Sequence, residues 1–241
     1  MKTFQEIEKL IQMGYRSFLI SGGLDLRGKI PYDSEILDKL FHLKESYNLK
    51  YNFHIGFPSE PINELRGLAD VVSFDFFSDT ELFEKIYGLR RTVDHLLLDA
   101  IISSKIYAVP HITIGIDCGK LTHESESLRI LSEYFSSVVL NVFIPTPSTR
   151  YENCSPPIID EVKKVFEQAK KTFKMVVLGC MQPKGIYRFH LQKALEDFVD
   201  VIVKPVTVRR EDFEGCCAFL LERLSQGVLS DVRQRILEET R

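Results

Sequence analysis

Polar and small residues interrupt several apolar stretches of this chain, and their types are those that bind ligands or transfer protons. Strands that are buried on both faces normally read as continuous apolar runs. Side chains in a strand alternate between two faces, so residues of one parity point the same way. We therefore expect a shared polar patch built from four stretches, which contribute Asn52, His54 and Gly56; Ser73 and Asp75; His111, Thr113 and Gly115; and Asn141.

The patch has more than one chemical interpretation. Buried polar groups are commonly paired with one another inside a core, whereas a shared patch at strand ends is typical of a ligand pocket. In such a pocket His54 or His111 can act as a general base while Asp75 fixes the tautomer. Two imidazoles and a carboxylate also suit zinc or iron, but no HxxxH spacing supports a metal site, and we expect none. The candidate catalytic residues are His54, Asp75, His111 and Asn141.

A second candidate site lies at the end of the first apolar run, YRSFLISGG from Tyr15 to Gly23. A buried strand reads as four to eight mostly apolar residues. A Gly-Gly pair then marks either a tight turn that needs positive φ or a place where a ligand approaches the backbone closely.

The elements that must position these residues repeat along the chain. Strand-like stretches alternate with helical patterns at roughly 30-residue spacing, which is typical of βαβ units and a parallel sheet. In such folds ligands bind at the carboxyl ends of the strands. Seven strands are predicted, within residues 15–23, 50–57, 70–77, 105–116, 137–147, 174–180 and 198–205, where a closed barrel takes eight.

Capping residues and prolines predict where the helices begin. A helix over Thr3 to Met13 has Thr3 as its N-cap. Pro31 is expected to open a helix that ends near Tyr47, and Pro156 or Pro157 to open another. The remaining predicted helices are a long region from Asp79 to Ser104 that Gly88 interrupts, Glu124 to Phe135, Gly185 to Glu196, and a helical tail from about residue 207.

Composition excludes several classes of protein. The 241 residues are 44% hydrophobic and 27% charged, close to the average of globular domains. A net charge of −3 without a basic stripe gives no support for binding nucleic acid or an anionic membrane. No stretch is long and apolar enough for a membrane span, and the N-terminus does not read as a signal peptide. Five cysteines without a disulfide-like framework suit a reducing compartment, so we expect a cytoplasmic protein.

These motifs together resemble a known family. SGG after an early strand, HITIGIDCG on a middle strand, and NVFIPTPST followed by LGCMQP are similar to the radical S-adenosylmethionine superfamily, in particular to biotin synthase and lipoyl synthase-like members. The resemblance covers about Thr3 to Val206 and implies a single α/β domain over residues 1–241. Its fold would be a parallel (β/α) TIM-like barrel, partial or open, with about seven strands.

The resemblance also implies roles for particular residues. Ser21, Gly22 and Gly23 would hold the methionyl amine of S-adenosylmethionine through backbone groups. Ile114 and Gly115 would support the adenine, with Ile144 and Pro145 flanking it.

Two departures from the family pattern limit what the chain can do. Leu24 stands where the family often has Glu. The CxxxCxxC loop that ligates the [4Fe-4S] cluster is absent, and such a cluster needs cysteine thiolates. The missing eighth strand is then the first one of the family, which carries that loop. The chain would be a shortened radical enzyme, one half of a split enzyme, or a cluster-free descendant.

Three functions remain open. With the missing piece restored, for instance by a second polypeptide, the resemblance implies radical chemistry on a small-molecule substrate. Without it, the chain would be a cluster-free enzyme that uses His and Asp for acid–base catalysis. A third possibility is a non-catalytic partner subunit that binds through the open sheet edge. The remaining histidines (His42, His95, His123 and His190) are expected at the surface.

Overall fold

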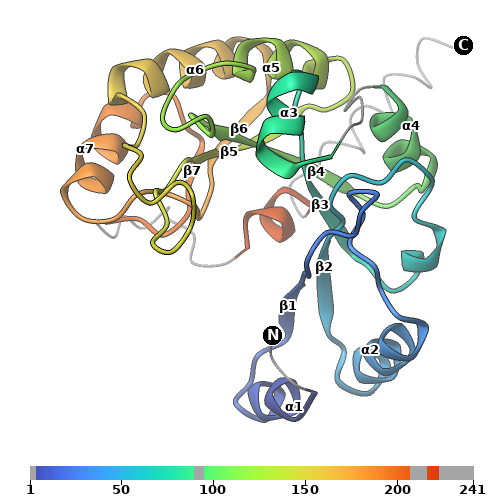
Figure 1. Cartoon of the computed structure of the whole chain (residues 1–241). Helices are drawn as coiled ribbons and strands as arrows, with labels where there is room; N and C mark the ends of the chain where they lie inside the picture. The colour runs from blue at the N-terminus through green and yellow to red at the C-terminus, as the bar shows by residue number, and fades with distance from the viewer. Residues whose placement is uncertain (1–3, 90–94, 207–215, 223–241) are drawn as a thin grey trace, which may run out of the picture.

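Seven parallel strands form one sheet in the computed structural model, and they follow one another in sequence order (Figure 1). The structure describes residues 4–89, 95–206 and 216–222. The sheet is curled into a partial barrel whose two edges, β1 and β7, do not pair with each other. The predicted fold class and number of strands are confirmed. The strands are β1 (Ser17–Ile20), β2 (Lys50–His54), β3 (Val71–Asp75), β4 (Ala108–Ile114), β5 (Ser137–Val142), β6 (Met175–Leu178) and β7 (Val201–Ile202).

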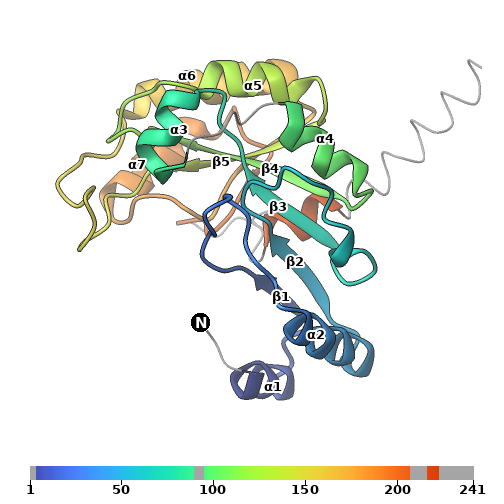
Figure 2. The ribbon, with the colours of Figure 1, turned by 45° about the vertical axis from the view of Figure 1, so that its right-hand side comes forward.

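Helices connect the strands and cover the convex face of the sheet. Figure 2 shows α1 and α2 at the β1 end, and α5, α6 and α7 together at the other end. The bounds are α1 (Phe4–Gln12), α2 (Ser34–Tyr47), η1 (Asn63–Leu65), α3 (Thr80–Tyr87), α4 (His95–Ser103), α5 (Glu124–Ser132), α6 (Ile159–Thr172) and α7 (Ile186–Leu195). The predicted cap Thr3 lies outside the described residues.

Two helix starts differ from the prediction. α2 begins after Asp33, whose carboxylate accepts the N–H of Glu35, and not at Pro31. α6 begins after Ile158, whose ψ of 131° is still extended, and not at Pro156 or Pro157. In the first case a side chain that satisfies a free helix N–H decides the start over a proline two residues earlier.

The start and the end of α3 follow the sequence signals. Asp79 caps the helix by accepting the N–H of Leu82, and Gly88 ends it with a left-handed φ of 70°. Both agree with the predicted start of the helical region at Asp79 and the predicted break at Gly88.

The core has two layers that correspond to the two faces of the strands. Phe53, Phe74, Ile112 and Leu140 belong to the larger cluster between the sheet and the helices. Residues of the opposite parity face the concave side, which we call the lumen. There Val71, Val109, Val139, Val177 and Val203 form a second cluster. Towards the carboxyl ends of the strands the same parity carries the polar residues, so one end of the lumen is apolar and the other is polar.

Residues 216–222, here called the lumen segment, close the apolar end. This segment is helical over residues 217–222 and packs its apolar side chains, including Phe219 and Leu221, against the lumen valines. The Tyr107 hydroxyl donates to the carbonyl of Leu221 at 3.1 Å. The rest of the predicted helical tail lies outside the described residues.

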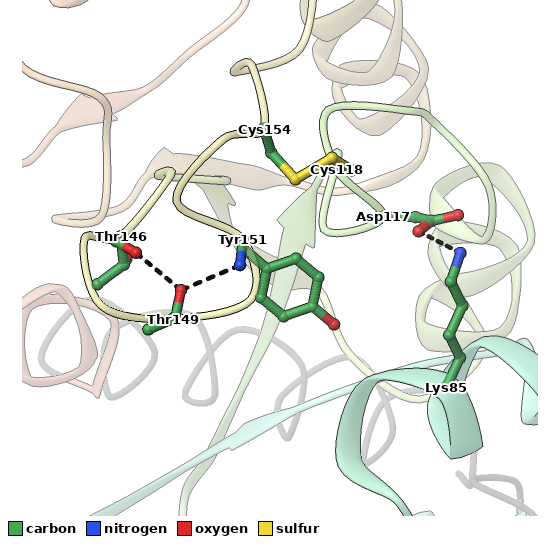
Figure 3. The surroundings of a disulfide bond; sticks show 7 residues. All are labelled: Lys85, Asp117, Cys118, Thr146, Thr149, Tyr151 and Cys154. Atoms are coloured by element: carbon green, nitrogen blue, oxygen red, sulfur yellow. Dashed lines mark hydrogen bonds and ion pairs between the residues drawn. A yellow bond between two sulfur atoms is a disulfide. The ribbon is translucent and has the colours of Figure 1, made fainter.

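A disulfide joins Cys118 to Cys154, which corrects the expectation that the cysteines form no disulfide (Figure 3). Cys118 lies in the loop after β4 and Cys154 in the loop after β5. The two loops leave neighbouring strands at the same edge of the sheet, so residues that are 36 positions apart meet. Gly119 shows how close the loops are, because a Cβ there would lie 2.4 Å from the carbonyl oxygen of Ser155.

Reducing this disulfide is expected to lower the free energy of unfolding by about 2–4 kcal/mol, because the bridge restricts the unfolded chain over a long loop. Urea unfolding with and without dithiothreitol measures the effect. The double variant Cys118→Ser/Cys154→Ser is the control and should not respond to the reductant. Equal stability of the oxidised and reduced wild type would contradict the prediction.

Within the three described ranges, none of the helices combines the length and apolar character that a bilayer-spanning segment needs.

Candidate functional site

The polar residues of one parity do face the same space. His54 pairs with Ser73 between β2 and β3, and Asp75 pairs with His111 between β3 and β4. Their immediate neighbours in each strand belong to the sheet–helix core, so the polar side chains point into the lumen. The strand register therefore brings His54, Asp75 and His111 together at the carboxyl ends of three adjacent strands.

A pocket of about 190 Å³ lies at these strand ends. It joins the end of β1 to the ends of β2 and β3. Its lining residues are Ser21, Gly22, Leu24, Ile30, His54, Gly56, Phe57, Asp75 and Tyr87. Two predicted sites that are far apart in sequence thus share one cavity: Ser21 and Gly22 of the SGG motif line it together with the His54–Asp75 pair, whereas Gly23 is not among the lining residues.

His54 and Asp75 form the charged pair of the pocket, with His54 Nε2 3.3 Å from Asp75 Oδ2. Burial opposes a charge on His54, but the hydrogen bond to Asp75 and its negative charge outweigh burial and raise the His54 pKa. Burial likewise opposes the Asp75 charge, and the hydrogen bond and charge of His54 outweigh it, so the pKa of Asp75 is lowered. Each partner therefore favours the charged form of the other.

His111 differs from His54 because burial dominates its titration. Burial lowers the pKa of His111 to about 4, against the opposing effect of Asp75. Its Nδ1 lies 3.1 Å from the carbonyl oxygen of Val109. A ring nitrogen must carry a proton to donate to a carbonyl, so Nδ1 is protonated and Nε2 is left as an acceptor at neutral pH.

The glycines of the SGG motif are not explained by backbone conformation. Eight other glycines in the described part of the chain have positive φ, but Gly22 and Gly23 do not. A Cβ at Gly23 would meet no atom within 4 Å. Within the described residues neither glycine exchanges a backbone hydrogen bond with another residue. Their peptide groups are therefore open to a ligand.

Other predicted binding residues lie elsewhere. The Ile114 side chain is fully buried in the sheet–helix core, away from the lumen. The N–H of Gly115 donates to Glu124 Oε1 at 2.8 Å, and the space of a Cβ there is filled by Pro157. Ile144 and Pro145 are half-buried after β5. The adenine-binding roles of these four residues stay predictions.

Asn141 lies on the lumen face of β5 but outside the pocket. Its Oδ1 accepts the N–H of Met181 at 3.3 Å. A Cβ on Gly179 would approach the same oxygen to 2.1 Å. Asn141 thus fastens the chain after β6 to β5.

Two tyrosines of the site were not predicted from the sequence pattern. Tyr87 lines the pocket from the end of α3, and burial together with the charge of Asp75 raises its pKa. The hydroxyl of Tyr32 donates to the carbonyl of His54. Neither tyrosine lies on a strand, so the alternation of strand residues gives no signal for them. The predicted helix break at Gly88 is the one sequence feature next to Tyr87.

The expectation that His123 is a surface residue was wrong. Its imidazole is 2% exposed and stacks on Phe77 with ring centroids 4.5 Å apart. Nδ1 hydrogen-bonds the hydroxyl of Ser127 at 2.8 Å. His42 and His190 are exposed as predicted, and the side chain of His95 lies outside the described residues.

The described residues contain no group of three or more His, Cys, Asp or Glu side chains arranged to hold a metal ion. This applies to His54, Asp75 and His111, which the sequence analysis weighed as ligands.

The sheet and its pocket define an α/β protein of the TIM-barrel class with a partial barrel and a candidate site at the strand carboxyl ends. No protein-family model and no curated protein matches the sequence. Among solved structures, the chain is similar to methylornithine synthase (PylB), with a TM-score of 0.58 and 16% sequence identity. The likeness covers 90% of this chain and 66% of that one. At this level of identity the likeness shows the fold alone.

Proposed function

We propose that this chain is a radical-SAM-like barrel protein that binds S-adenosylmethionine, or a related nucleoside-type ligand, at the carboxyl ends of its strands. The observation that carries the proposal is the pocket in which the backbone of Gly22 lies beside the His54–Asp75 pair. An open peptide N–H can donate a hydrogen bond to an amino acid moiety, and an open peptide carbonyl can accept one from it. The family resemblance implies such contacts for Ser21, Gly22 and Gly23.

The charge and size of the pocket agree with this ligand class. The lowered pKa keeps Asp75 ionised at neutral pH, and when its partner His54 is neutral this partly buried carboxylate attracts an amine or a sulfonium. Pockets for complete drug-sized ligands occupy about 300–1,000 Å³. The 190 Å³ observed here therefore accommodates one end of such a ligand. S-adenosylmethionine, when bound, supplies an electrophilic sulfonium, and the chain's own residues position it.

The iron–sulfur cluster of the family does not fit this chain. The sequence has no CxxxCxxC motif, and the described residues offer no group of metal ligands. In this proposal the chain holds no [4Fe-4S] cluster alone, and radical chemistry requires that a second polypeptide or further sequence supply the cluster loop.

Replacing Gly23 with valine is expected to weaken binding of S-adenosylmethionine by about tenfold or more, because a branched side chain blocks the close approach of a ligand to the backbone. Gly23 has no positive φ and nothing near its Cβ position, so the variant should fold normally. Titration calorimetry with S-adenosylmethionine measures the change.

Leu26→Ala provides the matched control, because Leu26 is 94% exposed in the same loop and should not alter affinity. If the wild type binds neither S-adenosylmethionine nor S-adenosylhomocysteine, the proposed function is wrong. If Gly23→Val binds as tightly as the wild type, the backbone assignment is wrong.

A second candidate function is acid–base catalysis without a cluster. His54 would act as the base with Asp75 fixing its orientation, and the 3.3 Å contact between them favours this function. A substrate turnover that is lost in His54→Gln and that needs no S-adenosylmethionine would distinguish it from the first proposal.

The third candidate is a partner subunit that binds through β1. This strand ends the sheet, and Leu19 on it is 59% exposed. An unpaired edge can accept another strand. In this case variants of His54 and Asp75 would leave complex formation unchanged, whereas Leu19→Lys would weaken it. Cytoplasmic location and the absence of nucleic-acid and membrane partners also stay proposals.

A further inference from the structure

Two adjacent cysteines lie in the lumen, outside the pocket lining. Cys216 and Cys217 begin the lumen segment, which packs against the valines of β3 to β7. Cys217 is 5% exposed, while Cys216 is only half-buried. The pair lies next to the polar residues of β2, β3 and β4, and the proposed function uses neither thiol.

Cys216 accepts hydrogen bonds from a network that two strands hold in place. The side-chain amide of Asn52 donates to Cys216 Sγ, with Nδ2 3.2 Å from the sulfur. The Ser73 hydroxyl donates to Asn52 Oδ1 at 2.9 Å, which turns the amide N–H groups towards the sulfur. Asn52 and Ser73 are both 2% exposed, so the donor is fixed by its surroundings.

Cys217 has a different partner. Its Sγ lies 3.9 Å from His111 Nε2. Because His111 Nδ1 carries the proton that it donates to Val109, Nε2 is an acceptor for the single S–H of Cys217, in competition with the Cys216 sulfur. The geometry thus assigns opposite roles to the two thiols. The sulfur of Cys216 accepts hydrogen bonds, and the S–H of Cys217 donates one.

The titration of the two thiols agrees with this division. The hydrogen bond from Cys217 lowers the pKa of Cys216 to about 6 against the effect of burial, and Asn52 and the N–H groups of Ala218 and Phe219 act in the same direction. The hydrogen bond to Cys216 and burial raise the pKa of Cys217, as do the charge of Cys216 and the nearby Cys180. At the other end of the segment Glu222 faces Lys50 of β2 at 3.9 Å.

We infer that Cys216 is a nucleophilic thiolate that exchanges with low-molecular-weight disulfides, and that the Asn52 amide stabilises it. In this step a bond forms between Cys216 Sγ and one sulfur of the disulfide, while the S–S bond of the reagent breaks. The second sulfur leaves with the electron pair as a thiolate. Cys216 is oxidised to a mixed disulfide, the leaving sulfur is reduced, and no proton is needed.

The test is the pH dependence of labelling with 4,4′-dithiodipyridine on the full chain. Cys180 is exposed and serves as an internal reference thiol. Trypsin releases Cys180 in the peptide 175–184 and both lumen cysteines in the peptide 211–223. Cys217→Ser isolates the signal of Cys216 and keeps an O–H donor beside its sulfur in place of the Cys217 S–H. The rate at Cys216 should reach half its plateau near pH 6, whereas an ordinary thiol does so near 8.5.

Asn52→Leu removes the donor and should move the midpoint for Cys216 upward, with a fall in rate of about threefold or more at pH 6.5. The rate at Cys180 should stay the same. If Asn52→Leu does not fold, Ser73→Ala leaves the amide in place but unoriented, and should shift the midpoint in the same direction. A wild-type midpoint near 8.5, labelling at Cys217 or Cys180 before Cys216, or a Cys216 that does not react in the folded chain would each overturn the inference.

Discussion

Replacing Asp75 with asparagine is expected to reverse the sign of the contribution that His54 makes to the pH dependence of stability. In the wild type the hydrogen bond and charge of Asp75 overcome burial and raise the pKa of His54. Asparagine keeps the shape of the side chain but removes the charge. Burial then dominates, so the pKa of His54 should fall below its ordinary value of about 6.5.

The consequence for stability follows from proton linkage. A raised folded-state pKa means that protonated His54 stabilises the wild type fully below about pH 6.5, and this contribution is lost as pH rises through the folded-state value. With the pKa lowered in Asp75→Asn, protonation instead destabilises the fold as pH falls below about 6.5. The contribution of Asp75 is lost only at more acidic pH, as pH falls through its own lowered pKa, so the range from pH 5.5 to 8 isolates the imidazole.

Urea unfolding of both proteins across this range measures the effect. The free energy difference between wild type and Asp75→Asn should widen steadily as the solution becomes more acidic. The same comparison in a His54→Gln background is the control, because without the imidazole the difference should not vary with pH. NMR titration of His54, with exposed His42 as reference signal, gives the protonation directly. If the free energy difference between the wild type and Asp75→Asn does not vary with pH while His54 is present, the two side chains are not coupled in solution.

The arrangement of strands was predictable because it depends on periodicity, which is local in sequence. Each apolar run predicted a strand, and parity alone indicated that His54, Asp75 and His111 share a face. The register between strands was not known, yet parallel strands align their carboxyl ends, so the SGG motif and the His54–Asp75 pair were expected at one edge. The pocket brings them together there.

Features that depend on which loops meet could not be predicted. The partners of the disulfide, Cys118 and Cys154, leave different strands, and no spacing rule connects them. His123 lies in a polar stretch that suggests a surface position, but stacking on Phe77 buries it. Cys216 follows the last strand by more than ten residues, and only tertiary packing returns it to the lumen beside Asn52.

The aromatic cluster beside the pocket, formed by Phe57, Phe77, Phe83 and Tyr87, is expected to contribute strongly to the stability of the fold. Phe83 is fully buried on α3. Its ring centroid lies 4.8 Å from that of Phe57, 5.9 Å from that of Phe77 and 4.9 Å from that of Tyr87. Truncating a buried phenylalanine removes apolar contact and leaves a cavity. Phe83→Ala is therefore expected to lower the free energy of unfolding by about 3–5 kcal/mol, measured by urea unfolding.

Phe41→Ala makes the same chemical change on α2, where the ring is 46% exposed, and should cost less than about 1 kcal/mol. Similar losses in the two variants would contradict the packing around Phe83. The cluster also connects stability to the site, because Phe57 and Tyr87, which contact Phe83, also line the pocket. Loss of the Phe83 ring removes the support behind both residues, so ligand affinity should fall in Phe83→Ala and stay unchanged in Phe41→Ala.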